Sequence, residues 1–452
     1  MSFPHRVKHE GSACRSQGSC LWCLRATLRI ALGTDEAQAG VWYDAEEARE
    51  VAKKAARERE AFEEAKLGSL RLRNRLTRTA AFEGMCPDGA PSSELCEHHR
   101  RMAAGGVSLT TVAYCSVSPE GRTYGHQLWM RPSIVAGLRQ LTDAVHAEGA
   151  AAAIQLGHSG YFASPAAIGT RPIGPSRLFN TYGLSFCRAM DRDDIERVVG
   201  DFVRAAELAR EAGFDAVEIH AGHGYLLSQF LSPFTNRRRD EYGGSLDDRL
   251  RLPLGVLERV RDGVGDDLAI LVKMNMRDGF AGGLELDEAV ECARRFETAG
   301  ATGLVLSGGF VSKTPFYMLR GNLPVREMVS VQPGALRKAG LTLFGRMLVQ
   351  EYPFEELFFL KDAERVRASV ELPLFLVGGV TSTATVNTAM VRGFDFVAMG
   401  RALIMDPDLP GKMMRGEASR SACDQCNHCI AEMDRGGVRC PHADDPARQS
   451  TK

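Results

Sequence analysis

The segment HAGHGY, residues 220–225, places two histidines three residues apart and a tyrosine two residues further on. His220 and His223 could be two ligands of a metal ion, but such a site needs a third histidine or a carboxylate nearby, and Glu218 is the candidate that the adjoining sequence offers. They could also be a buried, purely structural pair.

A third interpretation gives these residues a role in catalysis. Two imidazole N–H groups can bind a carbonyl oxygen and stabilise negative charge that develops on it, while Tyr225 delivers a proton to the neighbouring carbon. Together these groups can reduce an activated C=C bond. That reaction needs a hydride source, and a phosphorylated flavin would supply one.

The surrounding segments repeat one local pattern, an amphipathic helix followed by a glycine and a short apolar strand. Residues 193–213 place Ile195, Val198 and Phe202 on one helical face. Gly213 provides the left-handed residue that lets the chain leave the helix, and FDAVEIH follows as a strand. The same pattern recurs around residues 106, 149, 300 and 393.

Eight strands are predicted, near residues 76, 110, 152, 216, 270, 304, 375 and 396. Strands that alternate with helices imply a parallel sheet, and eight such units favour an α/β fold of the (β/α)8 TIM barrel type. A doubly wound sheet is the alternative, but no strand leads into a G-x-G-x-x-G loop. We expect an N-terminal extension with a charged helix at 1–61, the barrel at 62–415 with an insertion at 311–360, and a cysteine-rich tail at 416–452.

Charge and hydropathy restrict the partners and the location. The chain has 56 Lys and Arg against 57 Asp and Glu, which argues against nucleic acid or an acidic membrane surface as a partner. Its apolar runs are too short to span a bilayer, and Arg25 and Arg29 interrupt the one apolar stretch near the N-terminus. We therefore expect a cytoplasmic protein that acts on a small molecule, either alone or as a homo-oligomer.

Other polar residues and glycines fall where the predicted barrel strands end, which is where barrel enzymes carry their reacting groups. Gln155, His220 and Lys273 lie at the ends of the third, fourth and fifth strands. The seventh strand leads into Gly378 and Gly379, and the eighth into Gly400 and Arg401. Glycine amides and an arginine after these two strands predict a phosphate site, with simple tight turns as the alternative.

The stretch HAGHGYLLSQFLSPFTNRRRDEYGGSLDDR, residues 220–249, closely resembles the signature of the Old Yellow Enzyme family of FMN-dependent ene-reductases. Residues 66–85, 101–122 and 154–160 resemble the family's first three barrel units. The insertion VSKTPFYMLRGNLPVREM, residues 311–328, resembles the 2,4-dienoyl-CoA reductase branch, here without that branch's FAD and NAD domains. Tyr161 stands where the family has an arginine, which leaves the substrate preference open.

The resemblance implies a role for each matching residue. His220 and His223 would bind the substrate carbonyl, and Tyr225 would donate the proton. In the FMN site, backbone around Ala80 and Ala81 would meet the flavin, Gln155 would bond its pyrimidine edge, and Lys273 would replace an arginine beside that edge. Gly378, Gly379, Gly400 and Arg401 would hold the phosphate.

The implied activity is an FMN-dependent NAD(P)H oxidoreductase that reduces the C=C bond of an enone or enoate. The alternative is a redox-silent barrel isomerase or lyase that acts on a phosphorylated substrate. A third hypothesis is a binding protein that holds FMN without turnover.

Cys423, Cys426, Cys429 and Cys440 form a C-x2-C-x2-C-x10-C pattern in the tail. Four thiolates at such spacing bind a [4Fe–4S] cluster or structural zinc, and the remaining alternative is a tail without a metal. The pattern resembles the iron–sulfur segment of dienoyl-CoA reductase and trimethylamine dehydrogenase. Three further cysteines near the N-terminus do not make a complete ligand set alone. Even with His5 or His9, they would form at most a small metal site; they are Cys14, Cys20 and Cys23.

Overall fold

The computed structural model describes residues 60–180, 183–332 and 334–445. The expected N-terminal extension, with Cys14, Cys20 and Cys23, lies outside the described residues except for its last two positions. The last seven residues of the expected tail also lie outside them.

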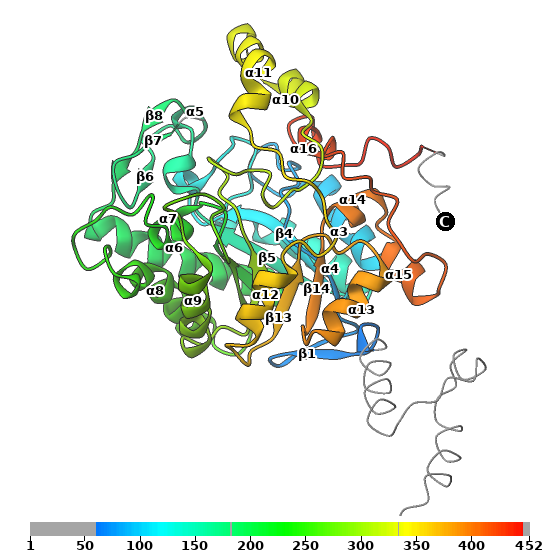
Figure 1. The fold of residues 1–452 in the computed structure, drawn as a ribbon. Coiled ribbons are helices and arrows are strands. Elements are labelled where there is room, and N and C mark those ends of the chain that lie inside the picture. Colours follow the sequence, from blue (N-terminus) through cyan, green and yellow to red (C-terminus); the bar gives the residue numbers. More distant parts are fainter. Residues whose placement is uncertain (1–59, 181–182, 333, 446–452) are drawn as a thin grey trace, which may run out of the picture. The chain divides into compact units, whose positions relative to one another are not determined.

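Eight parallel strands close into a barrel at the centre of the described chain (Figure 1). Each predicted strand position is occupied, and neighbours around the barrel follow chain order, with β5 paired to β10 and β14 paired to β3. The predicted (β/α)8 TIM barrel is therefore confirmed. The strands are β3 (Leu76–Arg78), β4 (Leu109–Ser116), β5 (Ala151–Gly157), β10 (Ala216–Ala221), β11 (Ala269–Asn275), β12 (Gly303–Ser307), β13 (Leu374–Val377) and β14 (Phe396–Met399).

Apolar side chains fill both faces of these strands, which is why the strands read as nearly continuous apolar runs. Inside the barrel, Leu109 and Leu271 pack with Phe375 and Phe396, whose rings stack at 4.5 Å between centroids. A hairpin of β1 (Ala65–Leu67) and β2 (Leu70–Leu72) adds Leu67 and Leu72 to this inner cluster. A larger core lies between the strands and the surrounding helices.

Helices surround the barrel, and the longest begins at a capping box formed by Asp191 and Asp194. The expected helix–glycine–strand junction is observed at Gly213, whose φ of +85° is left-handed. The helices are α3 (Ser93–Ala104), α4 (Val135–Ala147), α5 (Pro165–Ile168), α6 (Arg192–Glu211), α7 (Leu226–Leu231), α8 (Leu246–Val264), α9 (Leu286–Thr298), α10 (Val325–Val331), α11 (Ala335–Leu348), α12 (Leu360–Arg367), α13 (Thr383–Val391), α14 (Arg401–Met405), α15 (Leu409–Met414) and α16 (Cys429–Glu432).

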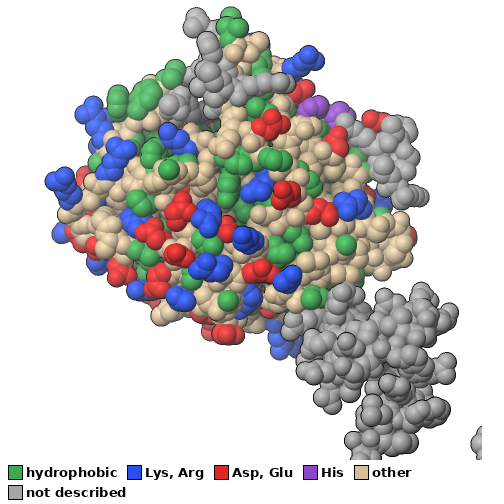
Figure 2. Space-filling view, viewed as in Figure 1, with side chains coloured by type: hydrophobic (Ala, Val, Ile, Leu, Met, Phe, Trp, Pro, Cys, Tyr) green, Lys and Arg blue, Asp and Glu red, His purple; other side chains and the backbone are tan. Residues whose placement is uncertain are grey.

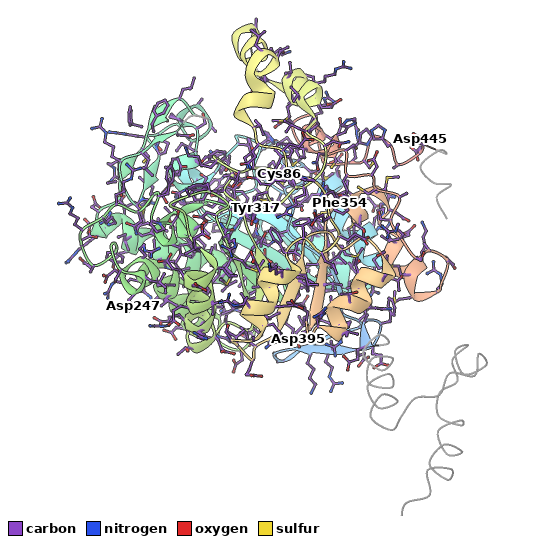
Figure 3. The ribbon with its side chains drawn as sticks, viewed as in Figure 1. Cys86, Asp247, Tyr317, Phe354, Asp395 and Asp445 are labelled. Atoms are coloured by element: carbon purple, nitrogen blue, oxygen red, sulfur yellow. The ribbon has the colours of Figure 1, made fainter. Side chains whose placement is uncertain are left out.

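Three segments gather at the carboxyl end of the barrel strands. Four two-residue strands, β6 (Ile173–Gly174), β7 (Phe179–Asn180), β8 (Ser185–Phe186) and β9 (Arg188–Ala189), form one excursion before α6. The insertion after β12 carries α10 and α11, which project from the barrel beside α16 of the tail (Figure 1). Tyr317 and Phe354 of the insertion lie at this end, and Asp395 marks the opposite end (Figure 3).

Acidic and basic side chains are interspersed over the face shown in Figure 2, in keeping with the near-zero net charge. Among the described residues, no helix combines the length and the apolar character needed to cross a membrane.

Candidate active site

One cavity of about 360 Å³ opens at the carboxyl end of the barrel strands, where barrel enzymes carry their reacting groups. All eleven residues that the sequence assigned to catalysis and flavin binding line this cavity, although they come from several different strands or the loops after them. They are Ala80, Ala81, Gln155, His220, His223, Tyr225, Lys273, Gly378, Gly379, Gly400 and Arg401.

The HAGHGY segment turns sharply at the end of β10, and this turn brings its three side chains together. His220 lies within the strand, whereas His223 takes a left-handed φ of +60°, and Tyr225 is the residue before α7. The ring of His220 lies 5.0 Å from that of His223 and 4.8 Å from that of Tyr225, centroid to centroid. Backbone strain of this kind concentrates at functional sites.

Both histidines are held neutral. Burial is the largest cause that lowers the pKa of His220 well below its usual value and that of His223 to about 3, and the cation of Lys273 acts in the same direction. Nδ1 of His220 accepts the backbone N–H of Gly222 at 3.3 Å, so the neutral ring carries its proton on Nε2. Nε2 of His223 is paired with the Ser307 hydroxyl at 2.8 Å. These rings are suited to hydrogen bonding rather than to carrying charge.

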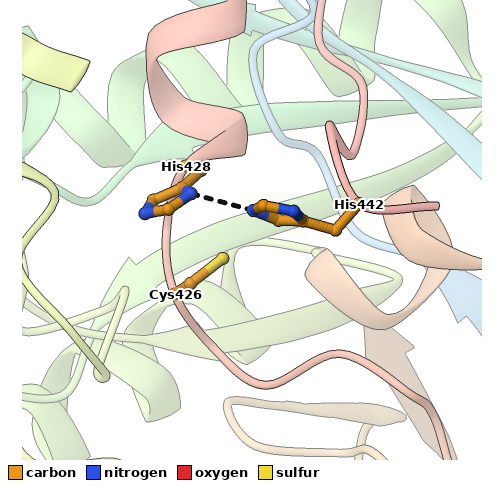
Figure 4. A group of neighbouring side chains, drawn as sticks. All are labelled: Cys426, His428 and His442. Carbon is orange, nitrogen blue, oxygen red and sulfur yellow. Dashed lines mark hydrogen bonds between the residues drawn. The ribbon is translucent and has the colours of Figure 1, made fainter. Parts of the chain in front are cut away.

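The structure does not provide the third ligand that a metal site at His220 and His223 would need. Glu218 does not approach them as a ligand but forms an ion pair with Lys273, 2.9 Å from Oε1 to Nζ. Among the described residues, the one group of three side chains arranged to hold an ion lies elsewhere, in the tail (Figure 4).

Tyr225 is a phenol held in its protonated form. Its ring lies 4.9 Å from Tyr114 and 6.3 Å from Phe162, centroid to centroid. Burial raises its pKa well above 10, with smaller contributions from Tyr114 and Tyr124. Tyr225 therefore keeps its proton across the neutral range until a stronger base forms beside it.

A buried ion pair and an amide bonded to it lie at the cavity wall. Glu218 accepts a hydrogen bond from Nε2 of Gln155 at 2.6 Å and pairs with Lys273, while Lys273 Nζ also lies 3.2 Å from the Thr79 hydroxyl. Glu218 is almost fully buried, so it fixes the side chains of Gln155 and Lys273 at the cavity wall. From the sequence, Glu218 was considered only as a third metal ligand, so this positioning role was not predicted.

The opposite end of the cavity carries the glycines and the arginine that the sequence predicted for a phosphate. Gly378 and Gly379 have φ values of +96° and +77°, and Gly400 precedes Arg401 at the start of α14. Arg401 donates through Nη1 to Asn427 Oδ1 at 2.6 Å and to the carbonyl oxygen of Arg320 at 2.8 Å. Among the described residues, the hydrogen bonds given for this guanidinium, including one to the carbonyl oxygen of Leu319 at 3.4 Å, all run through Nη1.

This arrangement fits FMN. A cavity of about 360 Å³ is in the range of small-molecule sites. An arginine and a glycine-rich turn stand at one end, and a lysine and an amide stand at the other.

The tail forms a wall of the cavity, which sequence reasoning did not predict. Gln425, Cys429, Ile430, Met433 and Val438 all line it. The side chains of Phe82, Tyr114, Tyr124, Phe162, Ser307 and Phe358 line it too and were also not predicted. The aromatic residues among them carry no strand-end signal of their own, so a local pattern could have identified only Ser307, at a strand end.

Tyr161, by contrast, does not line the cavity. It is buried against Phe310, and its hydroxyl bonds Ser312 at 2.5 Å.

The four tail cysteines, Cys423, Cys426, Cys429 and Cys440, line one small cavity of about 10 Å³ together with Arg401. That space suits one water-sized species. Burial raises the pKa of Cys429 to about 12, and the nearby Arg401 acts in the opposite direction. The four predicted ligands therefore border one common space, and whether they hold a metal stays a prediction.

Comparison with known proteins gives consistent results. Residues 60–306 match the model of the NADH:flavin oxidoreductase / NADH oxidase family. The chain is 42% identical to a 4,4'-dithiodibutanoate disulfide reductase of Rhodococcus erythropolis over 380 residues, 84% of this chain and 94% of the relative. It is 31% identical to an NADH oxidase of Thermoanaerobacter brockii over 372 residues, 81% of this chain and 52% of the relative.

A solved structure of an old yellow enzyme homologue from Zymomonas mobilis shares the fold, with a TM-score of 0.65 at 22% identity. The match covers 85% of this chain and 98% of that one. The chain spans about half the length of several other curated relatives that it matches.

Proposed function

Because the chain belongs to the NADH:flavin oxidoreductase / NADH oxidase family and is thus an oxidoreductase, we propose that it is an FMN-dependent NAD(P)H oxidoreductase that reduces the activated C=C bond of an enone or enoate. The alternative of a redox-silent isomerase is not supported, because the family consists of redox enzymes. The proposed branch is the one that resembles 2,4-dienoyl-CoA reductase.

The observation that carries the proposal is the grouping of donors in one cavity. His220 and His223, both neutral, stand beside the protonated phenol of Tyr225, and all three line the cavity that fits FMN. Neutral N–H donors stabilise an oxyanion without having to lose a proton first. A phenol of high pKa gives its proton only to a strong base such as a carbanion.

In this proposal, Gly378, Gly379, Gly400 and Arg401 hold the FMN phosphate. Gln155 and Lys273 bind the pyrimidine edge, and backbone at Ala80 and Ala81 faces the ring. When bound, FMN would take a hydride from NAD(P)H, and its reduced form would supply a hydride to the β-carbon of the substrate. His220 and His223 hold the substrate carbonyl oxygen, and Tyr225 delivers a proton to the α-carbon.

The test is an anaerobic absorbance titration of the flavin-loaded protein. We expect NADH or NADPH to bleach the flavin band and 2-cyclohexenone to restore it. Failure of the protein to bind added FMN would contradict the proposed cofactor. Bleaching of the flavin band without reoxidation by any enone or enoate would contradict the proposed substrate class.

A second candidate substrate is a linear organic disulfide, favoured by the 42% identity to the disulfide reductase over nearly the whole length of that relative. The same reduced protein, mixed with 4,4'-dithiodibutanoate, would then be reoxidised faster than with 2-cyclohexenone. The two reactions also differ in their need for a proton donor. Reduction of the enone adds a proton to the α-carbon, whereas cleavage of the disulfide releases a thiolate and adds no proton to carbon. Substitution of Tyr225 should therefore slow the enone reaction much more than the disulfide reaction.

For the tail, we propose that Cys423, Cys426, Cys429 and Cys440 ligate a metal centre, with [4Fe–4S] as the first candidate. Their convergence beside Arg401 supports this proposal, because a cation favours the thiolate form. The small space between the side chains means that a four-iron cluster requires the cysteines to turn outward. Iron and acid-labile sulfide analysis of anaerobically purified protein tests the proposal.

A further inference from the structure

The phenol of Tyr225 meets two further hydroxyl groups at the cavity wall. Its oxygen is hydrogen-bonded to the side chains of Tyr114 and Thr123. The hydroxyls of Tyr114 and Thr123 are in turn hydrogen-bonded to each other. The rings of Tyr114 and Tyr225 lie 4.9 Å apart, centroid to centroid. Each of the three hydroxyls therefore touches the other two, and together they form a closed group.

Both partners of Tyr225 come from one segment of the chain and are shielded from water. Tyr114 lies within β4, and Thr123 follows the short 3-10 turn at Pro119–Gly121. Tyr114 is 3% exposed and Thr123 is 1% exposed. A hydrogen bond in such surroundings acts more strongly on a charge than the same bond does in water.

The side chain of Gln127 fixes the backbone of both partners. Its Oε1 accepts the backbone N–H of Thr123 at 2.6 Å, and its Nε2 donates to the carbonyl oxygen of Tyr114 at 3.3 Å. Gln127 is itself completely buried. The two hydroxyls are therefore held in place before any charge develops beside them, as electrostatic stabilisation of a transition state requires.

One orientation of the hydroxyl protons satisfies all three groups. A hydroxyl donates one hydrogen bond and accepts up to two, so Tyr225 can donate to Tyr114, Tyr114 to Thr123, and Thr123 to Tyr225. Burial is the largest influence on the pKa of Tyr225 and raises it, and the bond to Tyr114 also raises it, whereas the bond to Thr123 lowers it. Thr123 is therefore the member of the group that favours the deprotonated phenol.

From this geometry we propose that Thr123 is a positioning residue for enone reduction, whose hydroxyl, held by Tyr114, stabilises the phenolate that forms on Tyr225. The inference rests on the proposed function. The O–H bond of Tyr225 breaks, its electron pair stays on the oxygen, and the α-carbon of the substrate gains the proton. A hydrogen bond to a charged group is stronger than one between neutral groups, so the bond from Thr123 strengthens as the proton leaves. A solvent proton restores the phenol after the product has left.

Stopped-flow kinetics of the flavin-loaded protein test this role. Thr123→Val removes the hydroxyl and keeps the shape of the side chain. It should leave flavin reduction by NADPH within about twofold of wild type and slow reoxidation by 2-cyclohexenone about 10- to 100-fold. Thr123→Ser restores a hydroxyl and should recover most of the rate. Added to Tyr225→Phe, Thr123→Val should cause no further slowing, because the two residues act through one proton transfer.

Thr142→Val is the matched control. Thr142 is also buried, but its hydroxyl donates to the carbonyl oxygen of Ala212 at 2.7 Å, outside the cavity. This variant should keep the wild-type rate of reoxidation. A normal rate in Tyr225→Phe would overturn the proposed proton donor itself. A slow Tyr225→Phe with a normal Thr123→Val, or further slowing in the double variant, would overturn the role of Thr123 alone.

A second measurement needs no turnover. 3-Fluorotyrosine placed at position 225 by amber suppression reports ionisation of the phenol in its ¹⁹F NMR shift. Thr123→Val should raise the midpoint of this titration by about one to two pH units. The titratable groups that face the phenol, Tyr114, Tyr124 and His220, are the same in both proteins. An unchanged or lower midpoint in Thr123→Val would overturn the proposal.

Discussion

At the scale of the residue, we expect Tyr225 to act only when the enone is reduced and not when NADPH reduces the flavin. Its high pKa keeps the phenol protonated until the substrate needs a proton. Tyr225→Phe removes the proton donor but keeps the ring that packs on Tyr114 and His220. Stopped-flow measurement should show flavin reduction by NADPH at the wild-type rate and reoxidation by 2-cyclohexenone slowed about 10²- to 10⁴-fold. Tyr242→Phe, outside the cavity, is the matched control. Equal slowing of both halves would mean that the phenol has a structural role.

Glu218 is the residue whose partners could not be foreseen from its neighbours in the sequence. Its pairing with Lys273 at 2.9 Å reduces the positive charge that, in the proposed FMN site, would face the pyrimidine edge. In Glu218→Gln the lysine cation is no longer compensated, so it should stabilise reduced flavin and raise the midpoint potential by about 20–50 mV. Spectroelectrochemical titration measures this shift, and Lys273→Met should shift the potential in the opposite direction. A lower potential in Glu218→Gln would contradict the inferred arrangement.

At the scale of the element, the turn after β13 packs closely against the backbone of residues 355–357, and only glycine leaves room for this contact. A Cβ on Gly379, whose φ is +77°, would lie 2.6 Å from the backbone nitrogen of Leu357 and 2.7 Å from the carbonyl oxygen of Glu355. Gly379→Ala should therefore displace the loop at residues 355–357 from the phosphate end and weaken FMN binding by at least about tenfold, or about 1.4 kcal/mol.

Gly393→Ala provides the control for Gly379→Ala. Gly393 has a similar φ of +84°, but its Cβ would meet open space. This variant should lose only about 1–2 kcal/mol of stability from left-handed strain and should bind FMN as wild type does. Fluorescence titration of apoprotein with FMN separates the two outcomes. Equal affinities in both alanine variants would show that the turn does not contact the cofactor.

The elements differ in how far the sequence determines them. The eight strands and the left-handed junction at Gly213 follow from apolar patterning within about twenty residues, and each was predicted at its observed place. Residues that end strands, such as His220 and Lys273, were placed by the same logic, because parallel strands present their carboxyl ends on one side.

Contacts between distant segments are the part that the sequence did not predict. Cys429 reaches the flavin cavity, and His428 meets His442, because the tail folds back across the barrel. No periodicity connects position 442 with position 428. Such contacts depend on how irregular segments pack, and irregular segments leave no pattern of alternating apolar residues to read.

At the scale of the whole molecule, the insertion and the tail act together on the barrel. Arg401 bonds the insertion at Arg320 and the tail at Asn427, and it also lines the cavity of the proposed FMN site. The phosphate end of the proposed FMN site and the four-cysteine centre therefore share one cation. We infer that cofactor and metal occupancy influence each other through this guanidinium.

The buried histidines make the stability of the whole molecule depend on pH. Burial lowers the pKa of His158 to about 4 and that of His223 to about 3, and it lowers the pKa of His220 as well. In the unfolded chain a histidine titrates near 6.5. Each of these groups therefore contributes stability that is complete above about pH 6.5 and is lost as the pH falls toward its folded pKa.

By pH 5 the loss should reach up to about 2 kcal/mol per histidine. Buried Asp278, whose pKa is raised by burial, acts in the opposite direction and offsets part of this loss. Urea unfolding at pH 7.5 and at pH 5.0, each at the same FMN concentration, measures the net effect, which should be a lower midpoint at pH 5.0. His158→Gln should reduce the difference between the two midpoints, because one of the groups that the unfolded chain protonates is gone. Equal midpoints in wild type at the two pH values would mean that these imidazoles gain protons without unfolding the barrel.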